Sequence, residues 1–299
     1  MDIQHLSKKI SPSFSLSAIT FTLKTGEITG LIGRNGNGKS SLFKTMVGLY
    51  QKDTGAVLID GQEIEHFTEQ KEHVFLLQDS IAYFDSLKLK EISAYYQLAY
   101  PRFNHGLFQR ELKKIKLTLD ERYGKLSKGT KTMVRLISAF ATGATYLFLD
   151  EPLDGLDTIQ RKRALGFILK QATSTQVSIL IASHQLQELE SIADRILVLK
   201  QGSLVKDFYL ERLHSTAIKV QFVFVTKEIP SIIRENATLL SVEGRVLTYL
   251  FEELPQELEE NIKETKPVLF EQLPVSIEDI IRSQSTKDPD YQMMNQEEC

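Results

Sequence analysis

The sequence is poor in cysteine and has no long apolar run, and both absences narrow its class. Cys299 is the single cysteine among 299 residues, so no intramolecular disulfide can form and a disulfide-stapled scaffold is excluded. A membrane-spanning helix needs about 20 predominantly apolar residues, whereas uninterrupted apolar runs such as 74–77 and 222–225 are four residues long. The first residues lack the basic start and apolar core of a signal peptide. We therefore expect a cytoplasmic protein that does not itself enter a bilayer.

The composition also lacks the biases of disordered, fibrous or nucleic-acid-binding chains. Glycine and proline number 16 and 8, while 42% of the residues are hydrophobic and 25% are charged, all ordinary values for a globular protein. The formal net charge is −3, so the chain as a whole has no basic excess that would favour nucleic acid. At roughly 100–200 residues per domain, the length predicts about two domains.

Strand-like and helix-like segments alternate through residues 1–213. Apolar runs such as 28–32, 146–149 and 177–182 are typical of strands buried on both faces. Because helically spaced segments separate these strands, the pattern predicts an α/β fold with a mainly parallel sheet. The other predicted strands are 1–8, 18–32 with a turn at 25–26, 56–60, 74–77 and the hairpin 196–206, and the predicted helices are 39–47, 83–119, 128–142 and 161–171.

The pattern changes after about residue 213. Segments between 218 and 273 follow the order β-α-β-β-α-β, which is the order of a ferredoxin-like unit. No catalytic constellation occurs there, and the isolated His214 and Asp279 are expected at the surface. We interpret this part as an interaction or regulatory domain. The expected divisions are a first domain at 1–213 with a helical subdomain at about 79–142, a small α+β domain at 214–283 and a flexible tail at 284–299.

Residues 33–40, Gly-Arg-Asn-Gly-Asn-Gly-Lys-Ser, fit the phosphate-loop pattern G-x-x-x-x-G-K-[ST] between a predicted strand and a predicted helix. Glycines let backbone N–H groups curl around phosphate oxygens, and the helix N-terminus adds positive potential. Lys39 would neutralise the β- and γ-phosphates, and Ser40 would bind Mg²⁺. A glycine-rich turn with a chance lysine is the alternative, which the flanking strand and helix disfavour. The motif predicts binding of ATP or GTP by Asn35, Gly36, Asn37, Gly38, Lys39, Ser40 and Ser41.

The apolar strand at 146–149 ends in two carboxylates, Asp150 and Glu151. In phosphate-loop proteins an aspartate at the carboxyl end of a neighbouring strand holds Mg²⁺. Glu151, one residue later, is placed to polarise an attacking water. Two acids at a surface-exposed strand end would be unremarkable by themselves, but beside a phosphate loop they indicate a metal ligand and a catalytic base.

Four further segments resemble those of the nucleotide-binding subunit of ATP-binding-cassette (ABC) transporters. Residues 126–130, Leu-Ser-Lys-Gly-Thr, are similar to the family's LSGGQ signature, and residues 153–157 are similar to its D-loop. Gln78 resembles the Q-loop glutamine, and His184 resembles the switch histidine. The resemblance covers residues 1 to about 213. It implies a phosphate-loop ATPase fold, with a mixed, mainly parallel sheet and a helical subdomain, that uses ATP and Mg²⁺.

The resemblance also implies a role for each matching residue. Ser127, Gly129 and Asp157 would face ATP held by a second subunit, so that two subunits enclose two nucleotides. His184 would hydrogen-bond the γ-phosphate, and Gln78 would contact Mg²⁺ and the attacking water. The implied partners are a second copy or a homologous ATPase subunit and a separate transmembrane permease, with no nucleic acid. The permease would hold the chain at the inner face of the cell membrane.

Two departures from the family pattern bear on ATP binding. Lys128 and Thr130 replace a glycine and the glutamine of the signature, and the lysine either strengthens contact with a γ-phosphate or points into solvent. Ile10 stands where the family places its adenine-stacking aromatic residue, with Phe14 nearby. Stacking on a base is worth ~1–3 kcal/mol, so base affinity is either weak or dependent on Phe14.

The segment at 79–122 is rich in aromatic residues and is the surface on which the family receives its membrane partner. The rings either form that surface or serve as the segment's own small core. They are Tyr83, Phe84, Tyr95, Tyr96, Tyr100 and Phe103.

The short helical segment and the carboxyl extension resemble bacterial exporter-type cassettes, including systems that export peptides or antimicrobials. We therefore expect ATP-driven dimerisation and hydrolysis to power export. A non-transport ABC-type ATPase and a weakly hydrolysing ATP switch are the alternatives. Only 111 residues separate Lys39 from Asp150, which leaves no room for the long coiled coil of the DNA-repair type.

Overall fold

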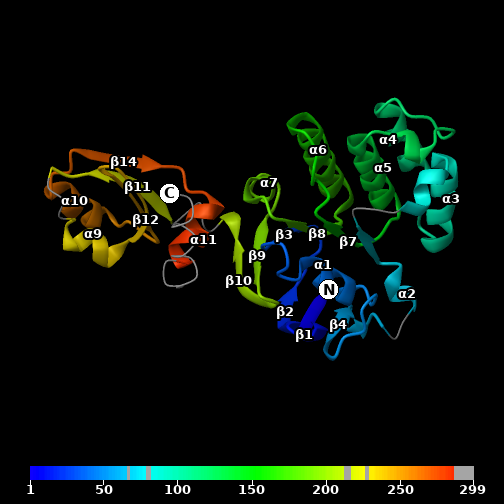
Figure 1. Cartoon of the computed structure of the whole chain (residues 1–299), viewed down its shortest axis with the longest axis horizontal. Helices are drawn as coiled ribbons and strands as arrows, with labels where there is room; N and C mark the ends of the chain where they lie inside the picture. The colour runs from blue at the N-terminus through cyan, green and yellow to red at the C-terminus, as the bar shows by residue number, and fades with distance from the viewer. Residues whose placement is uncertain (66–67, 79–81, 212–216, 226–228, 286–299) are drawn as a thin grey trace. The chain divides into compact units, whose positions relative to one another are not determined.

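The computed structural model divides the chain into two units, Met1–Phe208 and Tyr209–Cys299, which are described separately (Figure 1). This division lies slightly before the boundary predicted at 213. His214 and the tail from residue 286 lie outside the described residues, so the expectations for them stay predictions. The structure describes residues 1–65, 68–78, 82–211, 217–225 and 229–285.

A sheet in the order β10-β9-β3-β8-β7-β6 forms the centre of the first unit. The strands from β9 to β6 pair in parallel, and β3 and β8 are buried along their whole length, as their apolar sequences require. The predicted mainly parallel sheet is confirmed. Its strands are β3 (Ile28–Ile32), β6 (Val74–Leu77), β7 (Tyr146–Asp150), β8 (Ser178–Ser183), β9 (Arg195–Lys200) and β10 (Ser203–Tyr209).

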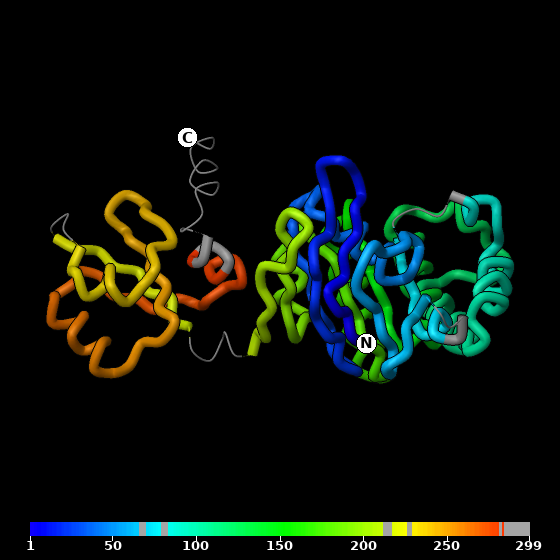
Figure 2. The backbone as a smooth tube through the Cα atoms, turned by 90° about the horizontal axis from the view of Figure 1, so that it is seen from below, coloured from blue at the N-terminus to red at the C-terminus, as the bar shows by residue number. Residues whose placement is uncertain are grey.

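A second sheet, in the order β2-β1-β4-β5, is antiparallel. Its first hairpin, drawn in blue in Figure 2, is longer than the strands predicted at 1–8 and from 18 onward. The prediction was wrong for the outer part of the hairpin, because pairs such as Lys9↔Ser15 and Ser11↔Phe14 make strands of segments with little apolar alternation. The strands are β1 (Asp2–Ser11), β2 (Phe14–Thr22), β4 (Thr54–Ile59) and β5 (Gln62–Glu63).

Helix α1 (Lys39–Met46) joins the two sheets through a shared core. Leu42, Phe43 and Met46 are fully buried there, and the Phe43 ring stacks on Phe148 of β7 with ring centroids 5.6 Å apart. The helix that begins at the phosphate loop is therefore anchored by packing on its apolar face. Other helices of the first unit are α2 (Thr68–Lys71), α6 (Thr158–Thr175) and α7 (Leu186–Glu190).

The helical stretch predicted over 83–119 is broken into separate helices. Asn104 caps the second α-helix by accepting a hydrogen bond from the Leu107 N–H at 2.8 Å, shortly after Pro101. None of the helices that the structure describes is long and apolar enough to cross a membrane. The helices between residues 82 and 141 are η1 (Ala82–Ser86), α3 (Leu89–Ala99), α4 (His105–Lys114), η2 (Tyr123–Lys125) and α5 (Lys128–Ala141).

Three of the six aromatic rings predicted for this segment are buried in its own core. Phe84, Tyr96 and Phe103 are buried, and Tyr96 contacts the other two rings. Tyr83 and Tyr95 remain 65% and 49% exposed. The reading as a small core therefore holds for the buried rings, and the reading as a partner surface stays a prediction for the exposed ones.

The second unit has the predicted element order β-α-β-β-α-β. Its antiparallel sheet has the order β12-β13-β11-β14, and Ile233 and Ile262 of the two helices join Phe222 and Phe251 in one core. A further helix, α11, packs by Ile280 in a separate cluster. The elements are β11 (Ile218–Val223), α9 (Ser231–Asn236), β12 (Thr238–Glu243), β13 (Val246–Phe251), α10 (Gln256–Glu264), β14 (Leu269–Leu273) and α11 (Ile277–Ser285).

Asp279 is buried, and the expectation that it lies isolated at the surface was wrong. Its carboxylate accepts from Lys219 Nζ at 2.9 Å and from the Ser276 N–H at 2.8 Å, while the Asp279 N–H donates to Ser276 Oγ. This reciprocal pattern is a capping box, and the Ser-x-x-Asp spacing at 276–279 was the sequence signal for it. Burial by itself would raise the pKa of Asp279, but the bonds from Ser276 and Lys219 lower it below its usual value.

Asp279→Asn should destabilise the second unit by about 1–3 kcal/mol at pH 7, because it removes a charge-assisted hydrogen bond from a buried site. A lowered native pKa stabilises the fold above the carboxyl's unfolded pKa, and this contribution is lost as the pH falls through the native value. The difference between variant and parent should therefore shrink at pH 3. Urea unfolding followed by hydrogen exchange in β11 and α11 measures it. The exposed Glu271→Gln serves as the control, and an equal loss at both pH values would contradict the assignment.

Candidate nucleotide site

The predicted site residues follow four neighbouring parallel strands of the central sheet. The phosphate loop follows β3, Gln78 follows β6, Asp150 and Glu151 end β7, and His184 follows β8. The pairing partners Ile32↔Ser183, Asp150↔Ala182 and Leu77↔Leu149 place these strand ends at one edge. That edge is where open α/β sheets bind ligands.

The phosphate loop packs tightly against β2 of the second sheet, and Lys39 packs against the loop. Gly38 has a φ of 100°, and a Cβ there would lie 2.7 Å from Phe14 Cζ, so only glycine suits both the backbone and the ring. Lys39 is 5% exposed, and its Nζ donates to the Gly33 carbonyl at 2.5 Å. The half-buried Phe14 ring therefore borders the loop.

The Asn37 side chain holds the loop to the turn after β9. Its Nδ2 donates to the Leu199 carbonyl at 3.1 Å, and its Oδ1 accepts from the Gln201 N–H at 3.3 Å. The Asn37 N–H also donates within the loop, to the Arg34 carbonyl at 3.1 Å. Asn37 thus shapes the loop through both its side chain and its backbone. Of the other residues predicted to contact nucleotide, Asn35, Gly36 and Ser40 are exposed and Ser41 is half-buried.

The Glu151 carboxylate lies between Lys39 and His184. Its Oε1 is 3.0 Å from Lys39 Nζ, and its Oε2 is 3.2 Å from His184 Nδ1. The φ of Glu151 is +44°, a left-handed conformation that costs a non-glycine residue about 1–3 kcal/mol and that clusters at functional sites. The backbone N–H of Glu151 donates to Ala182 on β8, which helps hold this conformation. Three residues far apart in sequence therefore form one polar cluster.

Asp150 and Ser40 present the oxygen donors that Mg²⁺ prefers. Asp150 Oδ1 is buried and has no hydrogen-bond partner in the described part of the chain, and the Asp150 carboxylate accepts a hydrogen bond from Ser40. Burial raises the pKa of Asp150, and the bond from Ser40 partly offsets this. Gln78 Nε2 is likewise buried without a partner within the described ranges. An orphaned carboxylate oxygen beside a hydroxyl fits a hard divalent cation.

The signature segment forms the first turn of α5. Ser127 Oγ accepts from the Thr130 N–H at 3.3 Å, which confirms the predicted N-cap at Ser127. Gly129 is buried against α6, where a Cβ would lie 1.8 Å from Gln160 Oε1. The glycine thus allows α5 and α6 to approach closely.

Lys128 is exposed and its side chain lies over Gly155, while its contact with a γ-phosphate stays a prediction. Its Nζ would lie 2.1 Å from a Cβ on Gly155, so the exposed lysine reaches across the D-loop of its own chain. The same D-loop ends at Asp157, whose carboxylate caps α6 by accepting from the Gln160 N–H at 2.8 Å. Signature and D-loop are thereby linked within one chain.

Two buried polar groups near these motifs were missed by the sequence analysis. Arg135 on α5 donates through Nη1 to the Gln78 carbonyl at 2.9 Å, which ties the signature helix to the end of β6. Glu188 accepts from Ser183 Oγ at 2.7 Å and pairs with Arg161 Nε at 3.0 Å, which ties the end of β8 to α6. A charged residue inside an apolar helix face was the available signal for Arg135.

The structure brings together Lys39, Ser40, Asp150, Glu151 and His184. Within the ranges described above, no hydrogen bond or ion pair joins the signature at 127–130 to this cluster. One chain therefore supplies a phosphate loop and a separate signature surface.

Comparisons with known proteins agree with this arrangement. Residues 16–154 match the family described as ABC transporter. Over 222 residues the chain is 31% identical to the SkfA peptide export ATP-binding protein SkfE of Bacillus subtilis (strain 168), a match that covers 73% of this chain and 92% of that protein. Over 280 residues it is 29% identical to the ABC transporter ATP-binding protein YtrB of the same organism, covering 94% and 96%.

A solved structure described as the ATP-binding subunit of an ABC transporter shares the fold. The match has a TM-score of 0.63 at 24% identity and covers 72% of this chain and 91% of that chain. The motifs, the strand order and the relatives point to the same conclusion: the chain belongs to the ABC transporter family, as an ATP-binding subunit that hydrolyses ATP.

Proposed function

We propose that this chain powers export of a peptide through a separate transmembrane permease, by ATP-driven dimerisation followed by hydrolysis. The observation that carries the hydrolytic part is the Glu151 carboxylate, held 3.0 Å from Lys39 Nζ and 3.2 Å from His184 Nδ1. Glu151 and His184 follow β7 and β8, and Lys39 begins α1 beside them, so a nucleotide phosphate would meet all three residues at this sheet edge.

In the proposed reaction Glu151 accepts the proton of the attacking water, which is general-base catalysis. The Lys39 ammonium now contacts Glu151, and its transfer to the β- and γ-phosphates would free the carboxylate for that water. His184 would then donate a hydrogen bond to the γ-phosphate instead of to Glu151. Phosphate binding would thus break the Lys39–Glu151 ion pair and so free the Glu151 carboxylate to act as the base.

Ser40 and Asp150 would hold Mg²⁺, and Gln78 would complete the site through its buried amide. When bound there, the ion supplies positive charge to the β- and γ-phosphate oxygens. We also propose that Phe14 borders the adenine, because its ring lies against the phosphate loop.

The signature residues would serve the ATP of a second subunit. Ser127 and Asp157 are exposed caps of α5 and α6, and each helix N-terminus offers unpaired N–H groups to an anion. With Gly129 between them, these caps would close on a nucleotide held by another copy or a homologous subunit. Two sites would then form across one dimer interface.

The permease would dock on the exposed side of the helical segment and hold the chain at the inner membrane face. Tyr83 and Tyr95 are both exposed, with ring centroids 6.4 Å apart, and Leu98 of α3 is 88% exposed. Exposed aromatic and apolar side chains of this kind favour a protein interface.

The relatives include one protein named for peptide export and others named for import, and their coverage differs. The relative named for peptide export is covered over 92% of its length, whereas a ribose import ATP-binding protein of Bacillus subtilis is covered over 44%. A spermidine/putrescine import protein of Protochlamydia amoebophila is covered over 70%. The 31% identity to the relative named for peptide export supports a peptide cargo.

Purification of the tagged chain from detergent-solubilised membranes tests this function. We expect a polytopic membrane protein to co-purify, to be identified by mass spectrometry, and to be lost from the double variant Tyr83→Ser/Tyr95→Ser. Leu169→Ser on α6, also an exposed apolar residue, is the matched control and should retain it. If no membrane protein co-purifies with the hydrolytically active chain, a non-transport ABC-type ATPase replaces this proposal.

A further inference from the structure

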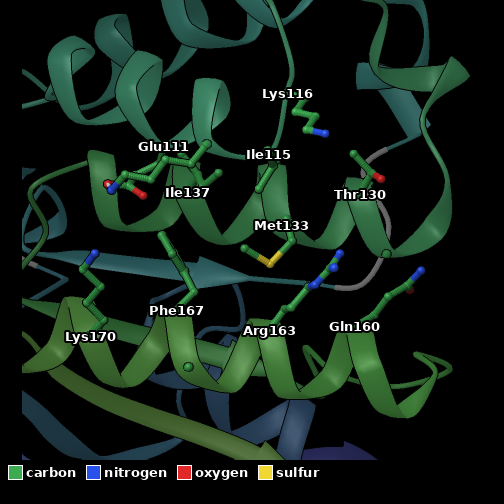
Figure 3. A pocket seen from close by; sticks show the side chains of 13 residues that line it. Glu111, Ile115, Lys116, Thr130, Met133, Ile137, Gln160, Arg163, Phe167 and Lys170 are labelled. Carbon is green, nitrogen blue, oxygen red and sulfur yellow. Dashed lines mark hydrogen bonds and ion pairs between the residues drawn. The ribbon is translucent and has the colours of Figure 1, made fainter.

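A groove of about 710 Å³ lies between α4, α5 and α6 (Figure 3). None of the phosphate-loop, Asp150 or Glu151 side chains lines it. Its volume falls within the roughly 300–1,000 Å³ typical of small-molecule sites. The floor is apolar and is formed by Ile115, Met133, Ile137 and Phe167.

The rim of the groove carries an excess of positive charge. Lys116, Arg163 and Lys170 line it, and among the described residues none forms a hydrogen bond or ion pair with their side chains. The acid in the lining, Glu111, is already paired with Lys114 at 2.6 Å. Figure 3 shows Arg163 and Phe167 rising together from α6 toward α5. An apolar floor below unpaired cations is complementary to an amphipathic anion.

Gly166, in the interior of α6, is not explained by any contact of the chain. A Cβ built there would meet nothing within 4 Å, and its φ is not left-handed. Glycine destabilises a helix interior relative to alanine. At position 166 no packing contact requires this less stable residue. Because Gly166 lines the groove next to Phe167, its bare backbone keeps room for a closely approaching ligand.

We propose that this groove binds a small amphipathic anion, a molecule with an apolar body and a phosphate, sulfate or carboxylate group. The apolar body lies on Met133, Ile137 and Phe167, and the acidic group meets Arg163 and Lys170. The Glu111 carboxylate is paired with Lys114, so it does not repel the ligand.

Binding there would also regulate ATP hydrolysis, a consequence that rests on the proposed function. Gly129 and Thr130 of the signature and Gln160 of the first turn of α6 line one end of the groove. A ligand wedged between α5 and α6 would therefore fix the signature relative to the helix that follows the D-loop. It would change turnover without contacting nucleotide.

Calorimetric titration of the full chain with dodecyl phosphate, below its micelle concentration and without nucleotide, tests binding. We expect one site, with inorganic phosphate and dodecyl maltoside each binding at least about tenfold more weakly, which is ~1.4 kcal/mol. Arg163→Gln and Lys170→Gln should each weaken binding about tenfold. Lys162→Gln, an exposed neighbour on α6 that does not line the groove, should leave it unchanged.

Substitutions at Gly166 separate binding from folding. Gly166→Leu should abolish binding by filling the groove, whereas Gly166→Ala should weaken binding and yet unfold at a higher temperature. Equal binding by Arg163→Gln and Lys162→Gln, or by dodecyl maltoside and dodecyl phosphate, would overturn the proposal. Preference for a polyglutamate peptide over dodecyl phosphate would also overturn it, in favour of a protein partner.

The regulatory consequence has its own readout. Dodecyl phosphate should change the ATP hydrolysis rate of the parent but not that of Gly166→Leu, and an equal effect on both would refute it. Because binding is measured without nucleotide, failure of the hydrolytic assignment and failure of the groove assignment are distinguishable.

Discussion

Glu151→Gln should lower the ATP hydrolysis rate by about 10²–10⁴-fold, because the amide cannot accept the proton of the attacking water. ATP binding should persist, since Lys39 and the phosphate loop are unchanged and Lys39 loses its competing ion pair with Glu151. The variant should therefore accumulate as an ATP-bound dimer. Phosphate release and size-exclusion chromatography, each with and without ATP, measure the two effects.

The control for this variant is Glu253→Gln, which changes an exposed carboxylate of the second unit and should hydrolyse ATP at the parent rate. Lys39→Ala separates binding from chemistry, because it should lose both nucleotide affinity and dimerisation. Undiminished hydrolysis in Glu151→Gln would remove Glu151 from the mechanism.

Arg195→Met should destabilise the first unit by about 3–5 kcal/mol, since it removes one partner from a buried charge network. Arg195 is 6% exposed and donates to both carboxylate oxygens of Asp207 and, at 2.6 Å, to the Thr22 carbonyl. Its Nη1 also lies 3.5 Å from Oε1 of the buried Glu27. The variant would leave the Glu27 charge buried and undercompensated. Urea unfolding followed by circular dichroism measures the loss.

Lys90→Met is the matched control, because the Lys90–Asp120 ion pair is 2.8 Å long but exposed. Exposed pairs contribute little to stability, so this variant should unfold with the parent. Hydrogen exchange should show the Arg195→Met effect concentrated in β3 and β9, whose residues Thr29 and Arg195 pair in parallel. Equal stability of the two variants would show that the network carries no net stabilisation.

The nucleotide motifs could be predicted because each depends on residues adjacent in sequence. The phosphate loop needs glycines and Lys39 between a strand and a helix, and Glu151 needs only an apolar strand before it. Ser127 is a local signal of the same kind, because a serine at the N-cap position predicts the start of a helix. Such local signals can be recognised without knowledge of the fold.

Other features escaped prediction because their partners are distant or their pattern is weak. The outer part of the β1–β2 hairpin has few apolar residues, and its pairing alone makes it a strand. Arg135 became recognisable only when the Gln78 carbonyl was placed beside it. Asp279 did have a local capping signal, but its ion pair with Lys219 spans 60 residues.

The sequence by itself determined the fold class, the family and the order of elements, and it predicted which residues contact ATP, because periodicity, capping and motif spacing are local properties. Only the tertiary structure decided that Glu151 lies between Lys39 and His184, that Lys128 crosses its own D-loop, and that a cationic groove opens beside Gly166. These features depend on distances between segments far apart in the chain. Packing sets such distances, and no local pattern of residues encodes them.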